Sequence, residues 1–316
     1  MTDVPNLNTP QSIHRVDHSD EDLSRQLRGA AGRKPAPWSY EELLVRHWRP
    51  VFEYAELCTV PGAAAGVLAA SAFTRVFVDT LRLAGPTAAW RPELLATVHR
   101  VAADWAQDPR RGACLHPDLR SRYGHAGARP SVPENRRLAY QAFQRLVEPA
   151  RCLLWHVEVD AEGVEVPTAL LGLAPETAAI RLESSRALFR QACVAAHRDL
   201  APDETCLRFS RLLEVSVQRG GTHLVPDLQH HIASCTHCRY AAEQLDHAGD
   251  HLGLLIAEAV LIWGARPYLA WRPARRTPPE HHAAAGSYGQ RLGTHRGPPS
   301  GRFSAGSPDS APPLSA

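Results

Sequence analysis

Apolar side chains recur at helical spacing through most of this chain, and this periodicity is what most limits the folds open to it. Between residues 38 and 264, leucine, valine, alanine and tryptophan return every three to four positions, as on one face of an α-helix. Alternation with a period of two, the signature of a half-buried strand, occurs only in "VEVDAEGVEV" (157–166). The pattern therefore predicts an all-α fold.

Proline and glycine separate the predicted helices into sets. The first set, 38–108, has three helices: one begins at a capping box of Ser39 and Glu42, and the third begins at Pro92. We expect them to form one small bundle. The next segment, 109–133, is rich in glycine, proline and arginine and indicates a basic linker.

The second set, 134–200, contains a short helix, a tight turn and a longer helix. Gly172 and Pro175 interrupt the pattern, so that a helix over 166–172 precedes one that starts at Pro175. This order is the outline of a helix-turn-helix. We expect a second small bundle here.

The third set, 201–272, ends with a predicted helix over about 239–264. The two ends of the chain, 1–37 and 273–316, are polar or rich in proline, glycine and serine, and bury too little apolar surface to offset the entropy of ordering. We expect a disordered arm and a disordered tail, with one short helix possible after Ser19, which Asp22 follows at capping-box spacing.

The stretch "HHIASCTHC" (230–238) carries the residue types of a metal site. His231, Cys235 and Cys238 form H-x3-C-x2-C, and on a helix these positions share one face. Imidazole and thiolate are preferred ligands of zinc. The alternative is a helix whose histidine and cysteines merely face solvent or pack. Four cysteines lack such spacing and are expected to be core or inert residues: Cys58, Cys114, Cys152 and Cys193.

Composition favours a cytoplasmic location without membrane contact. The chain does not open with a charged segment and an apolar run, as a secretory signal does. The longest apolar stretch, 252–265, contains Glu258 and is shorter than the roughly 20 residues of a membrane span. Seven cysteines are an odd number, and in a reducing compartment clustered cysteines are metal ligands more often than disulfides.

Several stretches match one known family in order and spacing. "ALLGLAPETAAIRLESSRALFR" (169–190) has Gly172 at a turn and Thr177 five residues later. "RHWRPVFEYA" (46–55) and "LLATVHRVAADWAQDPRR" (94–111) precede it. In these features the chain resembles the extracytoplasmic-function sigma factors of bacterial RNA polymerase.

The resemblance implies a promoter-binding helix-turn-helix at 169–190, and upstream helices that grip core RNA polymerase and melt the promoter. The residues that would contact DNA are Thr177, Arg181, Ser184, Ser185, Arg186, Arg110 and Arg111. The chain departs from the family in two places. "AAAGVLAASAFTRVF" (63–77) lacks the acidic and glutamine residues that contact polymerase, and the reading helix has Ala178, Ala179 and Ile180 at usually polar or basic positions.

The H-x3-C-x2-C motif has Cys206 upstream, with room for a helical hairpin between, and a long helix downstream. In this order the third set resembles the zinc-binding anti-sigma domains that often partner such sigma factors. The resemblance implies that Cys206, His231, Cys235 and Cys238 bind one zinc ion and that the last helix packs on the sigma-like part. Other candidates for the fourth ligand are His223, His230 and His237.

Four protein ligands leave no position for a catalytic water, so we expect a structural site and no enzyme. A zinc hydrolase, the competing class, would need an open position and a nearby base. A redox-sensing variant, in which Cys235 and Cys238 form a disulfide with loss of zinc, has the same sequence signature.

Charge is distributed unevenly along the chain. Residues 109–145 hold eight arginines against two acidic residues, a local balance of +6, and 176–198 have a balance of +2. Residues 201–271 have a balance of −3. Phosphate binding needs basic surfaces, although a solvated linker would look alike. We expect a sigma-factor-like regulator restrained in cis by its acidic zinc domain; the alternative is an interaction module that binds neither promoter nor polymerase.

Overall fold

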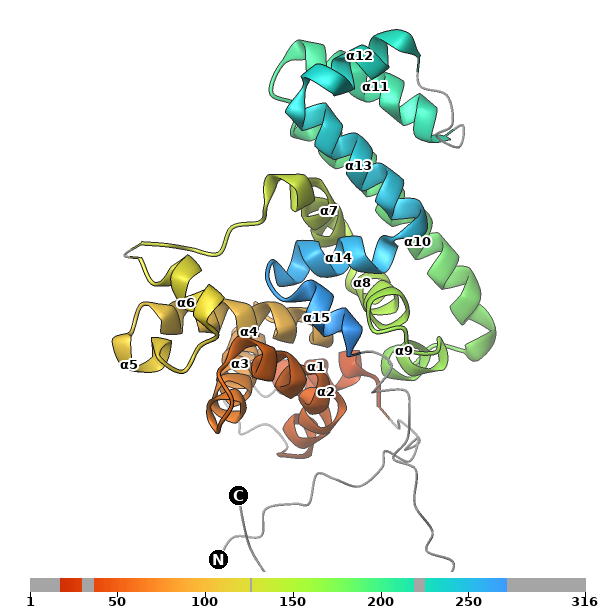
Figure 1. Ribbon diagram of the computed structural model, residues 1–316. Helices are drawn as coiled ribbons and strands as arrows, with labels where there is room; N and C mark the ends of the chain where they lie inside the picture. The colour runs from red at the N-terminus through yellow and green to blue at the C-terminus, as the bar shows by residue number, and fades with distance from the viewer. Residues whose placement is uncertain (1–17, 30–36, 126, 219–224, 272–316) are drawn as a thin grey trace, which may run out of the picture. The chain divides into compact units, whose positions relative to one another are not determined.

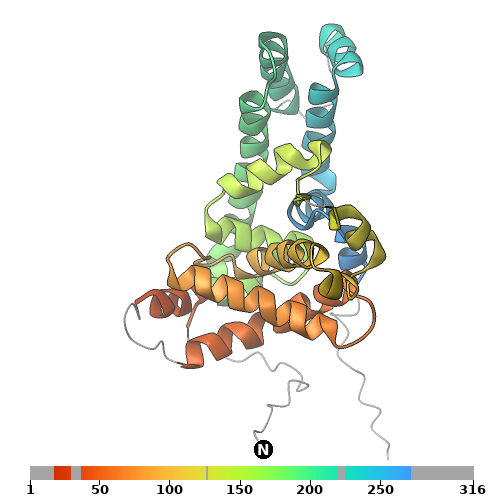
Figure 2. The same cartoon turned by 90° about the vertical axis from the view of Figure 1, so that its left-hand side faces the viewer.

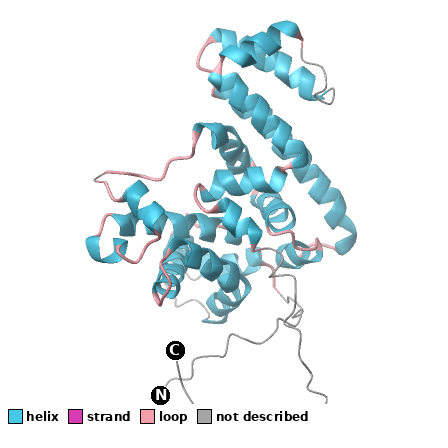
Figure 3. Ribbon diagram, viewed as in Figure 1, coloured by secondary structure: helices cyan, strands magenta, loops and turns pink. Residues whose placement is uncertain are grey.

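The computed structural model describes residues 18–29, 37–125, 127–218 and 225–271, and their fold is all-α, as predicted (Figures 1 and 3). No strand occurs in these ranges; the one extended pairing is an isolated bridge between Thr59 and Leu115. All of them belong to one compact unit, residues 1–278, and the second unit, 279–316, lies outside the described residues.

The helices, in chain order, are α1 (Asp20–Gly29), α2 (Pro37–Cys58), α3 (Ala64–Leu81), α4 (Trp90–Ala106), α5 (Pro109–Gly112), α6 (Pro117–Tyr123), α7 (Glu134–Arg145), α8 (Glu148–Leu154), the π-helix η1 (Trp155–Val159), α9 (Glu165–Leu171), α10 (Pro175–Asp199), α11 (Glu204–Gln218), α12 (Pro226–Ser234), α13 (Thr236–Asp250), α14 (Leu252–Leu261) and α15 (Ala265–Ala270).

Helix α1 lies within the segment 1–37 that we expected to be a disordered arm, and that expectation does not hold for its ten residues. A capping box starts it, as the sequence allows: the Asp22 amide donates to Ser19 Oγ at 3.1 Å and the Ser19 amide donates to Asp22 Oδ2 at 3.2 Å. Leu23 and Leu27 are fully buried, and α1 packs against α2, α3 and α9. Burial of this apolar face is what orders the helix. The rest of the predicted arm, 1–17 and 30–36, and the predicted tail lie outside the described residues.

Helices α2, α3 and α4 pack on one another, as predicted for the first set, but two of them begin earlier than expected. Helix α2 already includes Ser39, whose hydroxyl donates to Gln26 Oε1 at 2.9 Å, so Ser39 does not cap it. Helix α4 begins at Trp90 because Glu148 from α8 accepts hydrogen bonds from three backbone amides just before it, those of Thr87, Ala88 and Ala89, at 2.7, 2.7 and 3.0 Å. Long-range contacts thus replace the predicted local caps.

Helix α3 is long and apolar enough to cross a membrane by length and composition alone. In the structure its buried residues, among them Leu68, Phe73 and Val76, face α2 and α4. The longest apolar stretch of the sequence, 252–265, which was compared above with a membrane span, is divided between α14 and the turn before α15.

Residues 109–133, predicted to be a linker, contain the short helices α5 and α6. Asp108 caps α5 by accepting from the Arg110 amide at 2.8 Å and the Arg111 amide at 3.2 Å. Both helices pack against α4. The rest of the segment runs to α7 without regular structure in its described residues.

Helices α9 and α10 are joined by a tight turn at the predicted place. Gly172 ends α9 in the left-handed conformation (φ 61°), which glycine adopts at no steric cost. The stretch 157–166, which alternates at period two, forms no strand; it contains the end of η1 and the start of α9. Helix α7 packs against both α10 and α13, which lie side by side in both views (Figures 1 and 2).

The last predicted helix, 239–264, is divided into α13 and α14 by a bend at His251. Helix α14 packs against α4, α7 and η1, and α15 packs against α2. Contact with η1 is close: a Cβ atom on Gly253 would lie 2.1 Å from the Glu158 carbonyl oxygen. The C-terminal helices are therefore built into the packing of both earlier sets.

Candidate metal centre

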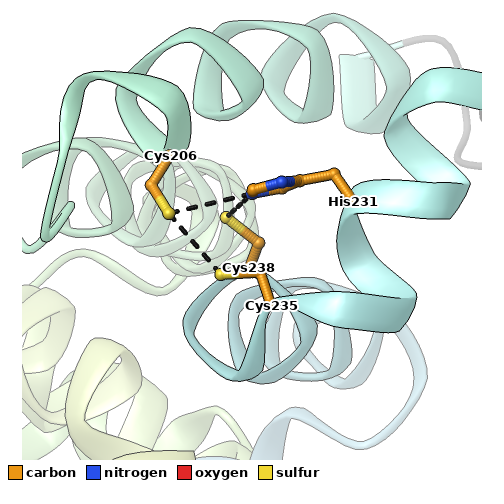
Figure 4. A group of neighbouring side chains, drawn as sticks. All are labelled: Cys206, His231, Cys235 and Cys238. Atoms are coloured by element: carbon orange, nitrogen blue, oxygen red, sulfur yellow. Dashed lines mark hydrogen bonds between the residues drawn. The ribbon is translucent and has the colours of Figure 1, made fainter.

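Four side chains from three helices and one inter-helix junction converge on one point (Figure 4). Cys206 lies in the first turn of α11, His231 lies in α12, Cys235 joins α12 to α13, and Cys238 lies in the first turn of α13. Their ligand atoms, three Sγ and one Nε2, are all within 4.8 Å of one another. These are the four residues that the sequence and its resemblance predict as ligands.

The distances within the cluster fit a tetrahedral ion. Cys206 Sγ lies 3.5 Å from Cys235 Sγ and 3.7 Å from His231 Nε2, and His231 Nε2 lies 3.3 Å from Cys238 Sγ. Zinc bonded at about 2.3 Å to sulfur and about 2.0 Å to nitrogen gives tetrahedron edges of about 3.8 Å and about 3.5 Å. The cluster could therefore hold a metal ion with little movement of its side chains.

The three residues of the motif do not lie on one continuous helix, which corrects the sequence-based expectation. Cys235 has extended backbone angles (φ −105°, ψ 113°), ends α12 and precedes α13. The bend redirects the chain, so Cys235 and Cys238 approach His231 from a second helix. The bend also leaves room for Cys206 of α11, because α11 packs against both α12 and α13.

The protein surroundings fix the ligands. The Phe209 ring stacks on the His231 ring with centroids 4.1 Å apart and an interplanar angle of 11°. Asp203 Oδ1 accepts from the Cys206 amide at 2.7 Å, which caps α11 at the turn that carries this thiol. Cys206 and Cys238 are buried, whereas His231 and Cys235 are half-buried. The site is thus shielded but not sealed.

The thiols need a cation to ionise together. Burial, reinforced by the neighbouring Cys235 thiol, raises the pKa of Cys206 to about 12, and burial likewise raises the pKa of Cys238. Burial also acts on Cys235, but hydrogen bonds from the Cys238 backbone N–H, from the Cys206 and Cys238 thiols and from the His237 backbone N–H outweigh it and leave the pKa of Cys235 below its ordinary value. A coordinated thiol is deprotonated by its metal ion, so a divalent cation bound here would supply the charge that this set lacks.

The alternative fourth ligands are not in the cluster. His230 is exposed, and the His237 ring lies 5.1 Å from that of His197. His223 lies outside the described residues. The other four cysteines are free: Cys58, Cys152 and Cys193 are buried and Cys114 is half-buried. Of the candidates that the structure describes, Cys206 completes the set.

A second cluster, which was not predicted from the sequence, combines His156, Asp160 and Glu162. Its cationic position is taken by Arg91, which donates to Asp160 Oδ2 at 2.9 Å and Glu162 Oε1 at 2.6 Å. Burial would raise the pKa of Glu162, but Arg91 and His156 lower it well below its ordinary value. Tyr268 also donates to Asp160, at 2.7 Å. This cluster is an ion-pair network that joins α4, the segment after η1 and α15.

The residues predicted to contact DNA fall into two groups. Arg181 and Ser184 are exposed on α10, Thr177 is half-buried near its start, and Arg110 and Arg111 are exposed on α5. Ser185 is buried and donates to the Arg181 carbonyl at 2.7 Å, so it is not positioned to contact DNA. Arg186 is half-buried and forms ion pairs with Glu158 and Glu183, so its charge is already neutralised.

No family model, curated protein or solved structure matches the chain.

Proposed function

We propose that this protein is a sigma-factor-like transcription regulator, located in the cytoplasm, that binds promoter DNA and core RNA polymerase and is restrained in cis by its C-terminal metal-binding helices. The metal is zinc, held by Cys206, His231, Cys235 and Cys238. Three soft thiolates and one imidazole in a small tetrahedral set favour zinc over oxygen-preferring cations. Four protein ligands give it a structural role.

The observation that carries this proposal is an ion-pair group, centred on a buried arginine, between the basic and acidic parts of the chain. Arg136 of α7 donates to Glu258 of α14 at 2.7 Å and to Glu243 of α13 at 3.1 Å, and only 7% of Arg136 is exposed. Arg136 is one of the eight arginines of the basic stretch, and both carboxylates come from the acidic one. This complementarity supports a restraint in cis.

Two further contacts support the same restraint. Gln244 of α13 accepts from the Ala139 amide of α7 at 3.0 Å. The Tyr54 hydroxyl of α2 donates to the Trp263 carbonyl at 2.8 Å. A tethered module with several such contacts acts at high effective concentration, so each contact can be individually weak.

A charge swap in the full-length chain tests the proposal. Arg136→Glu places three carboxylates together in a partly buried site, with Arg266 as their one remaining cation among the described residues. Because this is unfavourable, we expect the C-terminal helices to detach and the affinity for promoter DNA and core polymerase to rise about tenfold or more. The double variant Arg136→Glu/Glu258→Arg re-forms the pair and should return both affinities toward wild type. Arg25→Glu is the control, because it lies outside the basic stretch, its partners Glu21 and Asp22 are about half exposed, and surface pairs contribute little.

The readouts are retention on bacterial core polymerase and selection of genomic DNA fragments. Equal binding by all four proteins would reject restraint in cis. Absence of DNA and polymerase binding in the opened variant would support the alternative, a protein-interaction module. That alternative draws on α3, where Val67, Val78 and Leu81 are 57%, 37% and 41% exposed and the stretch 63–77 has no acidic residue.

A further inference from the structure

A small cavity lies where α4, α7, α8 and the end of α14 meet. Its volume is about 160 Å³, and its walls include Glu93, Arg100, Tyr140, Phe143, Arg151 and Ile262. None of these residues belongs to the metal centre or to the predicted DNA-contacting set. The walls come from all three predicted helix sets, so any occupant would touch each of them.

The charged groups of this cavity leave one cation without a close partner. Arg100 is satisfied by Glu93 and by Thr97 Oγ1, the latter at 2.6 Å. With the residues that the structure describes, Arg151 makes only long contacts: its Nη1 lies 3.4 Å from Gln144 Oε1 and its Nη2 lies 3.7 Å from Glu148 Oε1. Its Nε is buried and has no partner among the described residues.

Glu148 is a poor counter-ion for Arg151 because its other oxygen is committed to the backbone amides before α4. The Arg151 side chain is 19% exposed, so water compensates its charge only in part. An incompletely paired and largely buried guanidinium favours an anion beside it. The walls carry two arginines and one glutamate, and this net positive charge also favours an anion.

Backbone strain adds an independent indication at the same cavity. Ile262 has φ 63° and ψ −39°, a conformation that a β-branched residue rarely adopts. The turn is held by the Tyr54 hydroxyl, which donates to the Leu261 carbonyl at 3.3 Å and the Trp263 carbonyl at 2.8 Å. Strained residues that the surroundings hold in place are concentrated at ligand sites.

We propose that this cavity binds a small organic monocarboxylate about one ring in size, with its carboxylate at Arg151 and its apolar body against Tyr140 and Phe143. A cavity of about 150 Å³ accepts one benzene ring, which sets the size class. Guanidinium and carboxylate form charge-assisted, bidentate hydrogen bonds, which sets the chemical class. The ligand stabilises the packing of the three helix sets, because it binds only where they meet.

Benzoate and its neutral isostere benzamide test this inference on the full-length protein, by calorimetry and by the shift of the thermal unfolding midpoint. We expect benzoate to bind and to raise the midpoint in a concentration-dependent manner, and benzamide to bind at least tenfold more weakly. Arg151→Met keeps most of the side-chain length and removes the charge, so it should weaken benzoate binding at least tenfold. Arg120→Met, at an exposed position on α6, is the matched control and should leave affinity unchanged.

Absence of benzoate binding at millimolar concentration, or equal affinity for benzoate and benzamide, would overturn the inference. A second variant covers the case in which Arg151→Met perturbs folding: Ala96→Phe fills the cavity from α4, and it should abolish benzoate binding. Retention of full affinity by Ala96→Phe would also overturn the inference. These measurements involve neither DNA nor polymerase, so their outcome is separate from that of the proposed function.

Discussion

Cys206 is the residue on which the candidate metal centre depends most, because it is the member of the cluster that α11 contributes. His231, Cys235 and Cys238 lie within eight residues of sequence, whereas Cys206 is 25 residues upstream of His231. Loss of Cys206 leaves a three-ligand site in which water takes the fourth position.

We expect Cys206→Ser to weaken zinc binding by more than about a hundredfold, since changes even in outer-shell partners cost about 10- to 100-fold. Competition with a chromophoric chelator measures the affinity. Cys114→Ser is the control, because Cys114 is half-buried and stands outside the cluster. Equal zinc affinity of the two variants would remove Cys206 from the site.

His99 provides a pH-dependent contribution to stability. Burial, together with Arg122 and Arg100, lowers the pKa of His99 to about 4, and its Nε2 lies 3.1 Å from the Tyr123 hydroxyl. In the unfolded chain the pKa returns to about 6.5, so between these values the unfolded state binds more protons and stability falls as pH falls. The contribution is complete above pH 6.5 and is lost progressively toward pH 4.

From these values, proton uptake by His99 in the unfolded state should lower the free energy of unfolding by about 2 kcal/mol when the pH falls from 7.5 to 5.0. Urea unfolding of wild type and His99→Gln at both pH values isolates this contribution from that of other groups. The pH-dependent loss should be about 2 kcal/mol smaller in the variant. Identical losses would show that His99 is not held neutral.

Single residues were predictable where the signal is local. The spacing of the H-x3-C-x2-C motif predicted three members of the cluster, and Cys206 followed from a resemblance. The burial of Ser185 and the pairing of Arg186 with Glu158 were not predictable, because both depend on which face of α10 packs inward. Sequence spacing does not determine that face when the helix has partners on several sides.

At the scale of helices, close approach of backbones decides where elements end. Helix α14 crosses η1 at Gly253, where a Cβ would lie 2.1 Å from the Glu158 carbonyl oxygen. This contact requires the bend at His251 that separates α14 from α13, since one straight helix could not follow α13 and also cross η1.

We expect Gly253→Ala to destabilise the protein by about 1–3 kcal/mol, because the backbones must separate to admit the methyl group. Gly249→Ala in α13 is the matched control: a Cβ there has no neighbour within 4 Å, so the better helix propensity of alanine should stabilise by about 0.5–1 kcal/mol. Chemical denaturation of both variants measures the difference. Equal effects would contradict the close crossing.

Most helices were predictable from periodicity, but their ends were not. The capping box at Ser19 and Asp22 was found because it is local. The start of α4 depends on Glu148, 58 residues downstream of Trp90, and the start of α2 places Ser39 inside the helix. The π-helix η1 was missed because it overlaps "VEVDAEGVEV", where valine alternates with other residues as in a strand. The acidic residues of this stretch pair instead with Arg91 and His156.

At the scale of the whole described chain, buried polar contacts join segments far apart in sequence. Arg91 meets Asp160 and Glu162, Tyr268 meets Asp160, and Arg136 meets Glu258. A buried pair that loses one partner costs about 3–5 kcal/mol, so these contacts make the arrangement specific. The all-α class was predictable because helical periodicity is a local pattern. The placement of α14 and α15 was not, because pairing between residues so far apart leaves no pattern in a single sequence.

Removal of the metal should affect the chain unevenly. Helices α11 and α12 meet at the cluster, whereas α4 packs against α2 and α3 and contains the fully buried Trp90. After chelation we expect amide hydrogen exchange to accelerate by orders of magnitude in α11 and α12 and to change little in α4. Uniform acceleration, or none, would contradict a local structural role for the metal.

X-ray absorption at the zinc edge of the purified full-length protein tests the metal centre most directly. The geometry predicts one zinc per chain with three sulfur neighbours at about 2.3 Å and one nitrogen neighbour at about 2.0 Å. In Cys206→Ser one sulfur should be replaced by a light atom. A protein without bound zinc, or a wild-type shell with two or fewer sulfurs, would contradict the four-ligand site.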